Sequence, residues 1–219
     1  MQMCKCEDVQ MIYQFVSCIF SFAHWRHSFF ICTSAHFQIC TLANMRIIHK
    51  AKKGDYPEYA EMYMKWLPND GLILKHLKDN FEENKKFIYS LPEAVLYHRY
   101  QPGKWSIKEI LVHIVDDERI FAYRAMCFAR NEKNNLIGFD QDSYAIYSEA
   151  DSRSLDSIFE EYEAVRNSTI ALFNNLPESS LDRMGHGTGT FNDATVRALV
   201  YHIAGHEQHH INFIKQYYL

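Results

Sequence analysis

The sequence predicts an all-α protein whose core is a four-helix bundle. After about residue 70, apolar residues recur at intervals of three, four and seven in four long segments, the period of helices that bury one face. The connections between these segments are short or of medium length, as expected in a bundle. No alternating strand pattern of useful length appears after residue 45. The 219 residues are 47% hydrophobic and 23% charged, so the chain can bury such a core.

The first long helix is expected over about residues 70–90, where a Leu-Pro step ends it. Its apolar stripe is formed by Leu74, Leu77, Phe81, Ile88 and Leu91. The lead-in over residues 46–69 contains Pro57 and Pro68 as breakers. We therefore expect an irregular segment there, with a short helix around residues 58–66.

The second long helix begins at a capping box, Ser106-Ile107-Lys108-Glu109, and is expected to continue to about residue 130. A polar loop that includes residues 138–144 leads to the third helix, over about residues 155–175. The fourth helix begins after Asn192-Asp193, either of which can cap it, and runs almost to the end of the chain.

Residues 1–44 differ in kind from the rest of the chain. They carry four charged and eight aromatic side chains without a persistent helical or strand period. We expect a disordered, irregular extension, explained by an over-extended start of translation, ahead of a folded domain over residues 45–219. The alternatives are a genuine, poorly ordered extension and an anchor that docks on the domain.

Deleting residues 1–44 should therefore leave the fold and the metal content of the 45–219 domain intact. The measurement is the melting temperature and the metal content of the shortened chain beside the full chain. A melting temperature lowered by many degrees would show instead that the extension packs on the bundle.

Charge and cysteine usage exclude several classes of protein. The net charge is −4, whereas a nucleic-acid binder held by cations is usually strongly basic. The apolar run over residues 11–23 is too short to span a bilayer and lacks the basic start and the cleavage site of a signal peptide. Five of the six cysteines lie in the first 40 residues, which does not fit a disulfide scaffold. We expect a cytoplasmic protein that binds neither nucleic acid nor membrane.

The candidate chemistry lies in the fourth helix. His202, His206 and His210 are four residues apart, so they lie above one another on one helix face. The inward stripe of this helix is formed by Leu199, Ile203, Ile214 and Tyr217. His206 and His210 continue this stripe, so both imidazoles face the core. Because they lie one turn apart, they are spaced to bind one metal ion from a single helix. The alternative is that they are buried core histidines whose ring nitrogens form ordinary hydrogen bonds.

A third histidine favours the metal. His113 lies midway along the second helix, and if that helix neighbours the fourth, the three histidines form one site. Three protein ligands leave a coordination position open for water or substrate, which is typical of catalytic sites. His206-Glu207-Gln208-His209-His210 also matches the zinc-protease motif H-E-x-x-H, with Glu207 as the base, but only nine residues follow for the usual third ligand. A ferritin-like di-iron site fits less well, since His113 has no glutamate three residues before it.

Several motifs together resemble those of the DinB/YfiT-like superfamily. These are the run from Tyr100 to Glu109 followed by His113, the Gly138-Phe139-Asp140 segment, and Ala204-Gly205-His206-Glu207 with His209-His210. The resemblance covers about residues 55–219. It implies a four-helix bundle, often dimeric, with one divalent ion, usually zinc or nickel, held by three histidines. By motif position these are His113, His206 and His210.

The resemblance also sets the expected function. Characterised relatives include thiol-dependent S-transferases and isomerases, and many others are called metal-dependent hydrolases on sequence grounds. We expect a transferase that moves a low-molecular-weight thiol onto a small electrophile, because a metal lowers the pKa of a bound thiol or water. A metal-dependent hydrolase is the alternative, and a non-catalytic metal-binding stress-response protein is a rival of another class.

Three further residues are candidates to support the site. Asp117, one turn past His113, could orient a ligand imidazole or bound water, or be a solvated carboxylate. His202 stands where the family often has an apolar residue, and could be a fourth ligand, a donor to a ligand or a polar wall. Glu207 is the third candidate, from its place beside His206.

Overall fold

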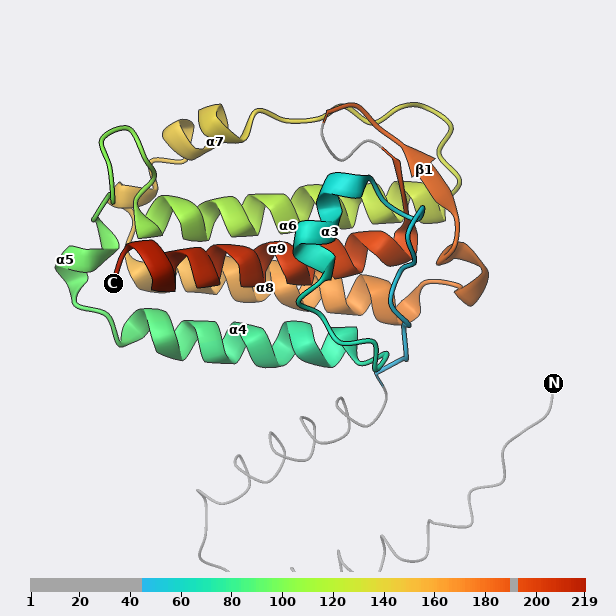
Figure 1. The fold of residues 1–219 in the computed structure, drawn as a ribbon, viewed down its shortest axis with the longest axis horizontal. Coiled ribbons are helices and arrows are strands. Elements are labelled where there is room, and N and C mark those ends of the chain that lie inside the picture. Colours follow the sequence, from blue (N-terminus) through green and yellow to red (C-terminus); the bar gives the residue numbers. More distant parts are fainter. Residues whose placement is uncertain (1–44, 190–192) are drawn as a thin grey trace, which may run out of the picture. The chain divides into compact units, whose positions relative to one another are not determined.

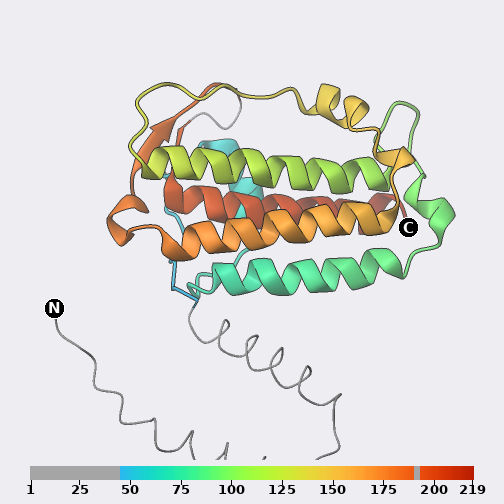
Figure 2. The same ribbon diagram turned by 180° about the vertical axis from the view of Figure 1, so that it is seen from behind.

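The computed structural model describes residues 45–189 and 193–219, so the expectation for residues 1–44 falls outside the described residues. Four long helices form a bundle (Figure 1): α4 (Ile73–Tyr89), α6 (Ile107–Ala129), α8 (Leu155–Asn175) and α9 (Val196–Tyr217). Both α6 and α4 pack against α8 and α9. Helix α9 lies between α6 and α4 on one side of the bundle, and α8 lies between them on the other (Figure 2). The predicted all-α four-helix bundle is confirmed.

The helix starts follow the capping residues in the sequence. The Ser106 side chain accepts the Glu109 N–H at 3.1 Å, and the Glu109 carboxylate accepts the Ser106 N–H at 2.7 Å. The predicted capping box therefore begins α6. The cap predicted at Asn192-Asp193 is wrong, because Thr195 caps α9 by accepting the Ala198 N–H. Asp193 belongs instead to a short strand that precedes the helix.

Two further expectations need correction. A hairpin joins β1 (Met184–His186) to β2 (Asp193–Thr195), although no strand was expected after residue 45. Each strand has three residues, too few to show a period of two. The expected polar loop over residues 138–144 contains the start of helix α7 (Gln141–Tyr147), which Asp140 caps by accepting the N–H groups of its first turn.

The lead-in folds as expected into one short helical segment. It consists of η1 (Glu58–Ala60) and α3 (Glu61–Met64), and α3 packs against α9. Gly205 permits this close approach, since a Cβ there would lie 2.6 Å from the Tyr63 carbonyl oxygen. The remaining short elements are α5 (Glu93–Leu96), η2 (Ala150–Ser152) and η3 (Glu178–Ser180).

Two apolar clusters fill the bundle, and buried polar side chains accompany them. The predicted inward stripe of α9 is correct for Leu199, Ile203 and Ile214, which are buried, and wrong for Tyr217, which is 48% exposed. Tyr217 lies in the last turn of α9, where its ring packs at 4.5 Å against that of Phe213. Among the described residues, none of the helices combines the length and apolar character needed to cross a membrane.

Candidate metal centre

Three imidazoles converge where α6 faces α9. The Nε2 atom of His206 lies 3.2 Å from that of His113 and 3.1 Å from that of His210. One nitrogen from each ring falls within 4.8 Å of the other two, and the side chains of His113 and His206 are buried. The capping box sets the start of α6, and His113 on this helix faces α9. On α9, the four-residue spacing places the rings of His206 and His210 on one helix face.

Hydrogen bonding alone does not satisfy this arrangement. A neutral imidazole nitrogen without a proton offers one in-plane lone pair, so His206 Nε2 can accept from only one of its two close neighbours. A metal ion between the three nitrogens uses a lone pair from each. Zinc–nitrogen bonds of about 2.0–2.1 Å at tetrahedral angles would place ligand nitrogens roughly 3.3 Å apart. The residues present therefore fit a divalent cation.

The protonation states also suit metal binding. Burial lowers the pKa of His206 and of His210 well below the usual histidine range, and the neighbouring imidazoles lower both further. Burial lowers the pKa of His113 as well, against a smaller opposite effect of Asp117. Rings that resist protonation stay neutral near pH 7, which is the form that donates a lone pair to a metal.

Asp117 lies behind the ring of His206. Its Oδ2 atom is 3.3 Å from His206 Nδ1 and 3.3 Å from His202 Nε2. Metal-ligating imidazoles usually direct their second nitrogen toward a carboxylate of this kind, which fixes the tautomer and the ring orientation. The structure thus places Asp117 where it can orient His206, a ligand carried by the neighbouring helix.

His202 lies outside the three-nitrogen cluster. Its ring is buried, packs at 3.9 Å from the Phe121 ring centroid and shares Asp117 with His206. It also lies one turn before His206, or about 6 Å along the helix axis, which is far for an ion held between His206 and His210.

Replacing His202 by alanine should therefore leave near-stoichiometric metal in the protein. The measurement is metal content by elemental analysis of tag-free protein, beside the unaltered chain. Loss of the ion in His202→Ala alone would make His202 a ligand and would overturn the three-histidine assignment.

Glu207 does not reach the histidine cluster. Its carboxylate accepts the Asn84 amide N–H at 3.0 Å and the Tyr162 hydroxyl, and lies 3.2 Å from Arg166 Nη2. These partners belong to α4 and α8, so the side chain lies on another face of α9 from His206 and His210. The suggested supporting role of Glu207 beside the metal is corrected, and the zinc-protease interpretation loses its base.

A cavity of about 620 Å³ opens beside His210. Its lining comes from the loop before α6, the start of α6, helix α7 and the end of α9. Figure 1 shows these segments at one end of the bundle. Its aromatic wall consists of Tyr100, Trp105, Phe213 and Tyr218, and the Trp105 ring lies 4.7 Å from that of His113. Tyr100 and Trp105 belong to the run before His113 that resembles the superfamily, but the sequence assigns them no role. The tertiary fold alone brings the four rings together.

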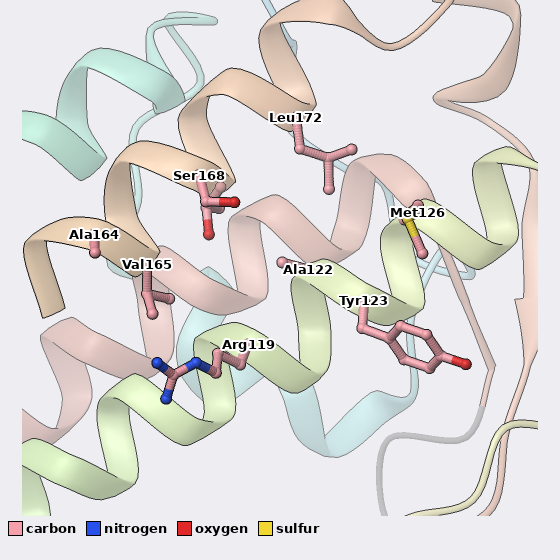
Figure 3. A pocket seen from close by; sticks show the side chains of 9 residues that line it. Arg119, Ala122, Tyr123, Met126, Ala164, Val165, Ser168 and Leu172 are labelled. Carbon is pink, nitrogen blue, oxygen red and sulfur yellow. The ribbon is translucent and has the colours of Figure 1, made fainter. Parts of the chain in front are cut away.

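A second hollow, of about 450 Å³, lies between α6 and α8 (Figure 3). Ala122, Met126, Val165 and Leu172 supply much of its lining, and Arg119 lies at one end. None of the three clustered histidines lines it. The cavity beside His210, unlike this hollow, can bring a small molecule to the candidate metal centre.

Comparisons with known proteins identify the family of the chain and support its fold. A family model described as the DinB superfamily matches residues 76–214. The chain is 24% identical over 143 residues to "Putative metal-dependent hydrolase OB0413" of Oceanobacillus iheyensis, a match that covers 65% of this chain and 81% of that protein. YfiT from Bacillus subtilis superposes with a TM-score of 0.57 at 13% identity, over 77% of this chain and 90% of that chain. It is described as a probable metal-dependent hydrolase with an unusual four-helix bundle topology, and at this identity the likeness shows the fold alone.

Proposed function

The chain belongs to the DinB superfamily, and from this premise we propose that it is a metal-dependent hydrolase of small molecules. His113, His206 and His210 would hold its single divalent ion. The observation that carries the proposal is the convergence of three largely buried imidazole nitrogens, one of them from His210, which lines a cavity. Three protein ligands leave one position for water or substrate.

The residues around the ion have distinct tasks. When bound, the ion supplies a Lewis acid and lowers the pKa of a water molecule. Asp117 Oδ2, 3.3 Å from His206 Nδ1, would favour the tautomer with its proton on Nδ1, which leaves Nε2 for the ion. The Tyr63 ring packs edge-on at 5.5 Å from the His206 ring and covers the site from the side of α3. The aromatic wall of the cavity, which includes Trp105, receives the apolar part of a substrate.

The thiol-dependent transfer expected from the resemblance has no support in the names of the relatives, which both refer to hydrolases. An open position on the metal nevertheless suits a thiolate as well as water, so transfer is the competing outcome of the test. We also propose that the ion is zinc or nickel and that the protein is a homodimer. Elemental analysis and the mass in solution test these two points.

The test of the function uses tag-free, metal-loaded protein. Chromogenic esters and amides probe hydrolysis, and chlorodinitrobenzene with several cellular thiols probes transfer. We expect ester or amide hydrolysis that disappears in the metal-free protein and in His113→Ala. Thiol-dependent consumption of chlorodinitrobenzene without hydrolysis would favour the transferase. Neither activity in a metal-loaded protein would favour the non-catalytic metal-binding protein.

A further inference from the structure

The cavity beside His210 has a charge pattern that a metal-dependent hydrolase does not by itself require. Four of its lining residues are charged: Arg99, Lys104, Glu109 and Asp142. Two of them are already paired, since Arg99 Nη2 lies 2.9 Å from Glu109 Oε1 and 3.1 Å from Asp151 Oδ2. Glu109 is further held by the capping box of α6. This pair therefore belongs to the framework of the cavity.

The other two charged side chains have no such partner among the described residues. Among the described residues, the side chains of Lys104 and Asp142 form no ion pair and no hydrogen bond. They come from different parts of the chain, Lys104 from the loop before α6 and Asp142 from the first turn of α7. One positive and one negative group thus line the same cavity without neutralising each other.

Much of the remaining lining of the cavity is aromatic. The ring of Tyr100 lies 5.5 Å from that of Phe213 and 5.3 Å from that of Tyr218, and Trp105 extends this wall toward His113. Such a wall buries an apolar or aromatic body, since pockets for small molecules combine apolar lining with a few polar groups that fix orientation.

The balance of charge distinguishes among possible ligands. Arg99 and Lys104 stand against Glu109 and Asp142, so the charged side chains of the lining are two positive and two negative. A ligand with a single charge would pair with one of Lys104 and Asp142 and would cover the other without supplying an opposite charge. Covering an unpaired charge costs free energy, whereas a ligand with both charges satisfies both groups.

We propose that this cavity binds a zwitterion of the amino-acid type, with its ammonium at Asp142, its carboxylate at Lys104 and an apolar or aromatic side chain on the aromatic wall. The ligand is an amino acid, a short peptide or a derivative that keeps both charges. This inference rests on the proposed function in one respect, since it names the substrate class of the same site.

Calorimetric titration of the full-length, tag-free protein tests the proposal with four ligands. L-Phenylalanine and glycyl-L-phenylalanine are zwitterions with different charge separations, 3-phenylpropanoate keeps only the carboxylate, and 2-phenylethylamine keeps only the ammonium. We expect the better zwitterion to bind about fivefold more tightly than either single-charge analogue, as one accessible ion pair allows. Which zwitterion binds better distinguishes an amino acid from a peptide.

Two variants test which residue pairs with which charge of the ligand. Lys104→Met should weaken binding of the better zwitterion about fivefold and leave 2-phenylethylamine unchanged. Asp142→Asn should weaken the same zwitterion and leave 3-phenylpropanoate unchanged. Both side chains are exposed, so both variants should fold, and circular dichroism checks this. Lys53→Met and Glu160→Gln are matched controls, because they remove exposed charges that do not line the cavity.

Three results would overturn the proposal: a single-charge analogue that binds as tightly as the better zwitterion, zwitterion affinity unchanged in both variants, or no zwitterion binding at millimolar concentration. Parallel titrations of metal-free and metal-loaded protein separate this inference from the proposed function. Zwitterion selectivity in a protein that binds no metal would sustain the inference and end the proposed function. Metal-dependent hydrolysis without that selectivity would do the reverse.

Discussion

Replacing any one of His113, His206 and His210 by alanine is expected to remove most of the bound metal while the bundle stays folded. Losing a group that merely orients a ligand costs about 10–100-fold in metal affinity, so losing a ligand itself should cost more. The fold should survive because two apolar clusters supply most of its stability, and a bound ion adds only its linkage free energy.

His209→Ala is the matched control for this series. His209 is a neighbour of His210 in sequence, but its side chain points about 100° away around the helix. Its ring packs instead at 5.5 Å from that of Tyr63, and it is not one of the three clustered histidines. Elemental analysis and helical circular dichroism of the four variants are the measurements. Equal metal retention in all four variants, or loss of metal in His209→Ala alone, would mean that the three histidines are ordinary core residues and not metal ligands.

The pH dependence of metal binding follows from the same site. Protons compete with the ion for imidazole nitrogens, so affinity should fall as the pH falls. Because burial lowers the pKa of His113, His206 and His210, competition at these rings should set in below about pH 6.5, the usual histidine value. Metal affinity measured from pH 8 downward checks this. A loss of affinity that begins above the usual histidine value would show that these rings are not the groups that titrate.

Much of this architecture is predictable because it depends on local rules. Ser106 and Glu109 fix the start of α6 through four consecutive residues, and the predicted capping box forms as expected. The spacing of His206 and His210 sets their shared face in the same way. The role of His113 needed one long-range assumption, that the second and fourth long helices are neighbours, and α6 does pack against α9.

The remaining features depend on partners that are distant in sequence. Glu207 follows a candidate ligand directly, yet Asn84 and Arg166 bind its carboxylate from other helices. No local pattern around Glu207 predicts this. The hairpin β1–β2 likewise depends on pairing across a loop, and Gly185 of β1 packs against Phe128 of α6, where a Cβ would lie 2.0 Å from the ring.

The environment of Glu207 is a buried charge network that joins the four long helices. Arg166 on α8 is 2% exposed, binds Glu118 of α6 with Nε and Nη2 at 2.9–3.1 Å and lies 3.2 Å from Glu207 of α9. It also donates to the Leu77 carbonyl oxygen of α4. Burial alone would lower the pKa of Arg166, but Glu118 and Glu207 raise it well above its usual value, so the guanidinium stays charged. One cation therefore serves two buried carboxylates.

Arg166→Met should consequently destabilise the protein by about 3–5 kcal/mol, because it leaves two buried carboxylates without their cation. The free energy of unfolding from urea denaturation is the measurement. Arg119→Met is the matched control, since Arg119 is 49% exposed in its pairs with Asp116 and Glu161 and should cost about 1 kcal/mol or less. Adding Glu118→Gln and Glu207→Gln to Arg166→Met should recover part of the loss, because the amides remove the unpaired charges. A loss in Arg166→Met no larger than in Arg119→Met would mean that the carboxylates take up protons or water at little cost, and that the network does not hold the ligand-bearing helices α6 and α9 together.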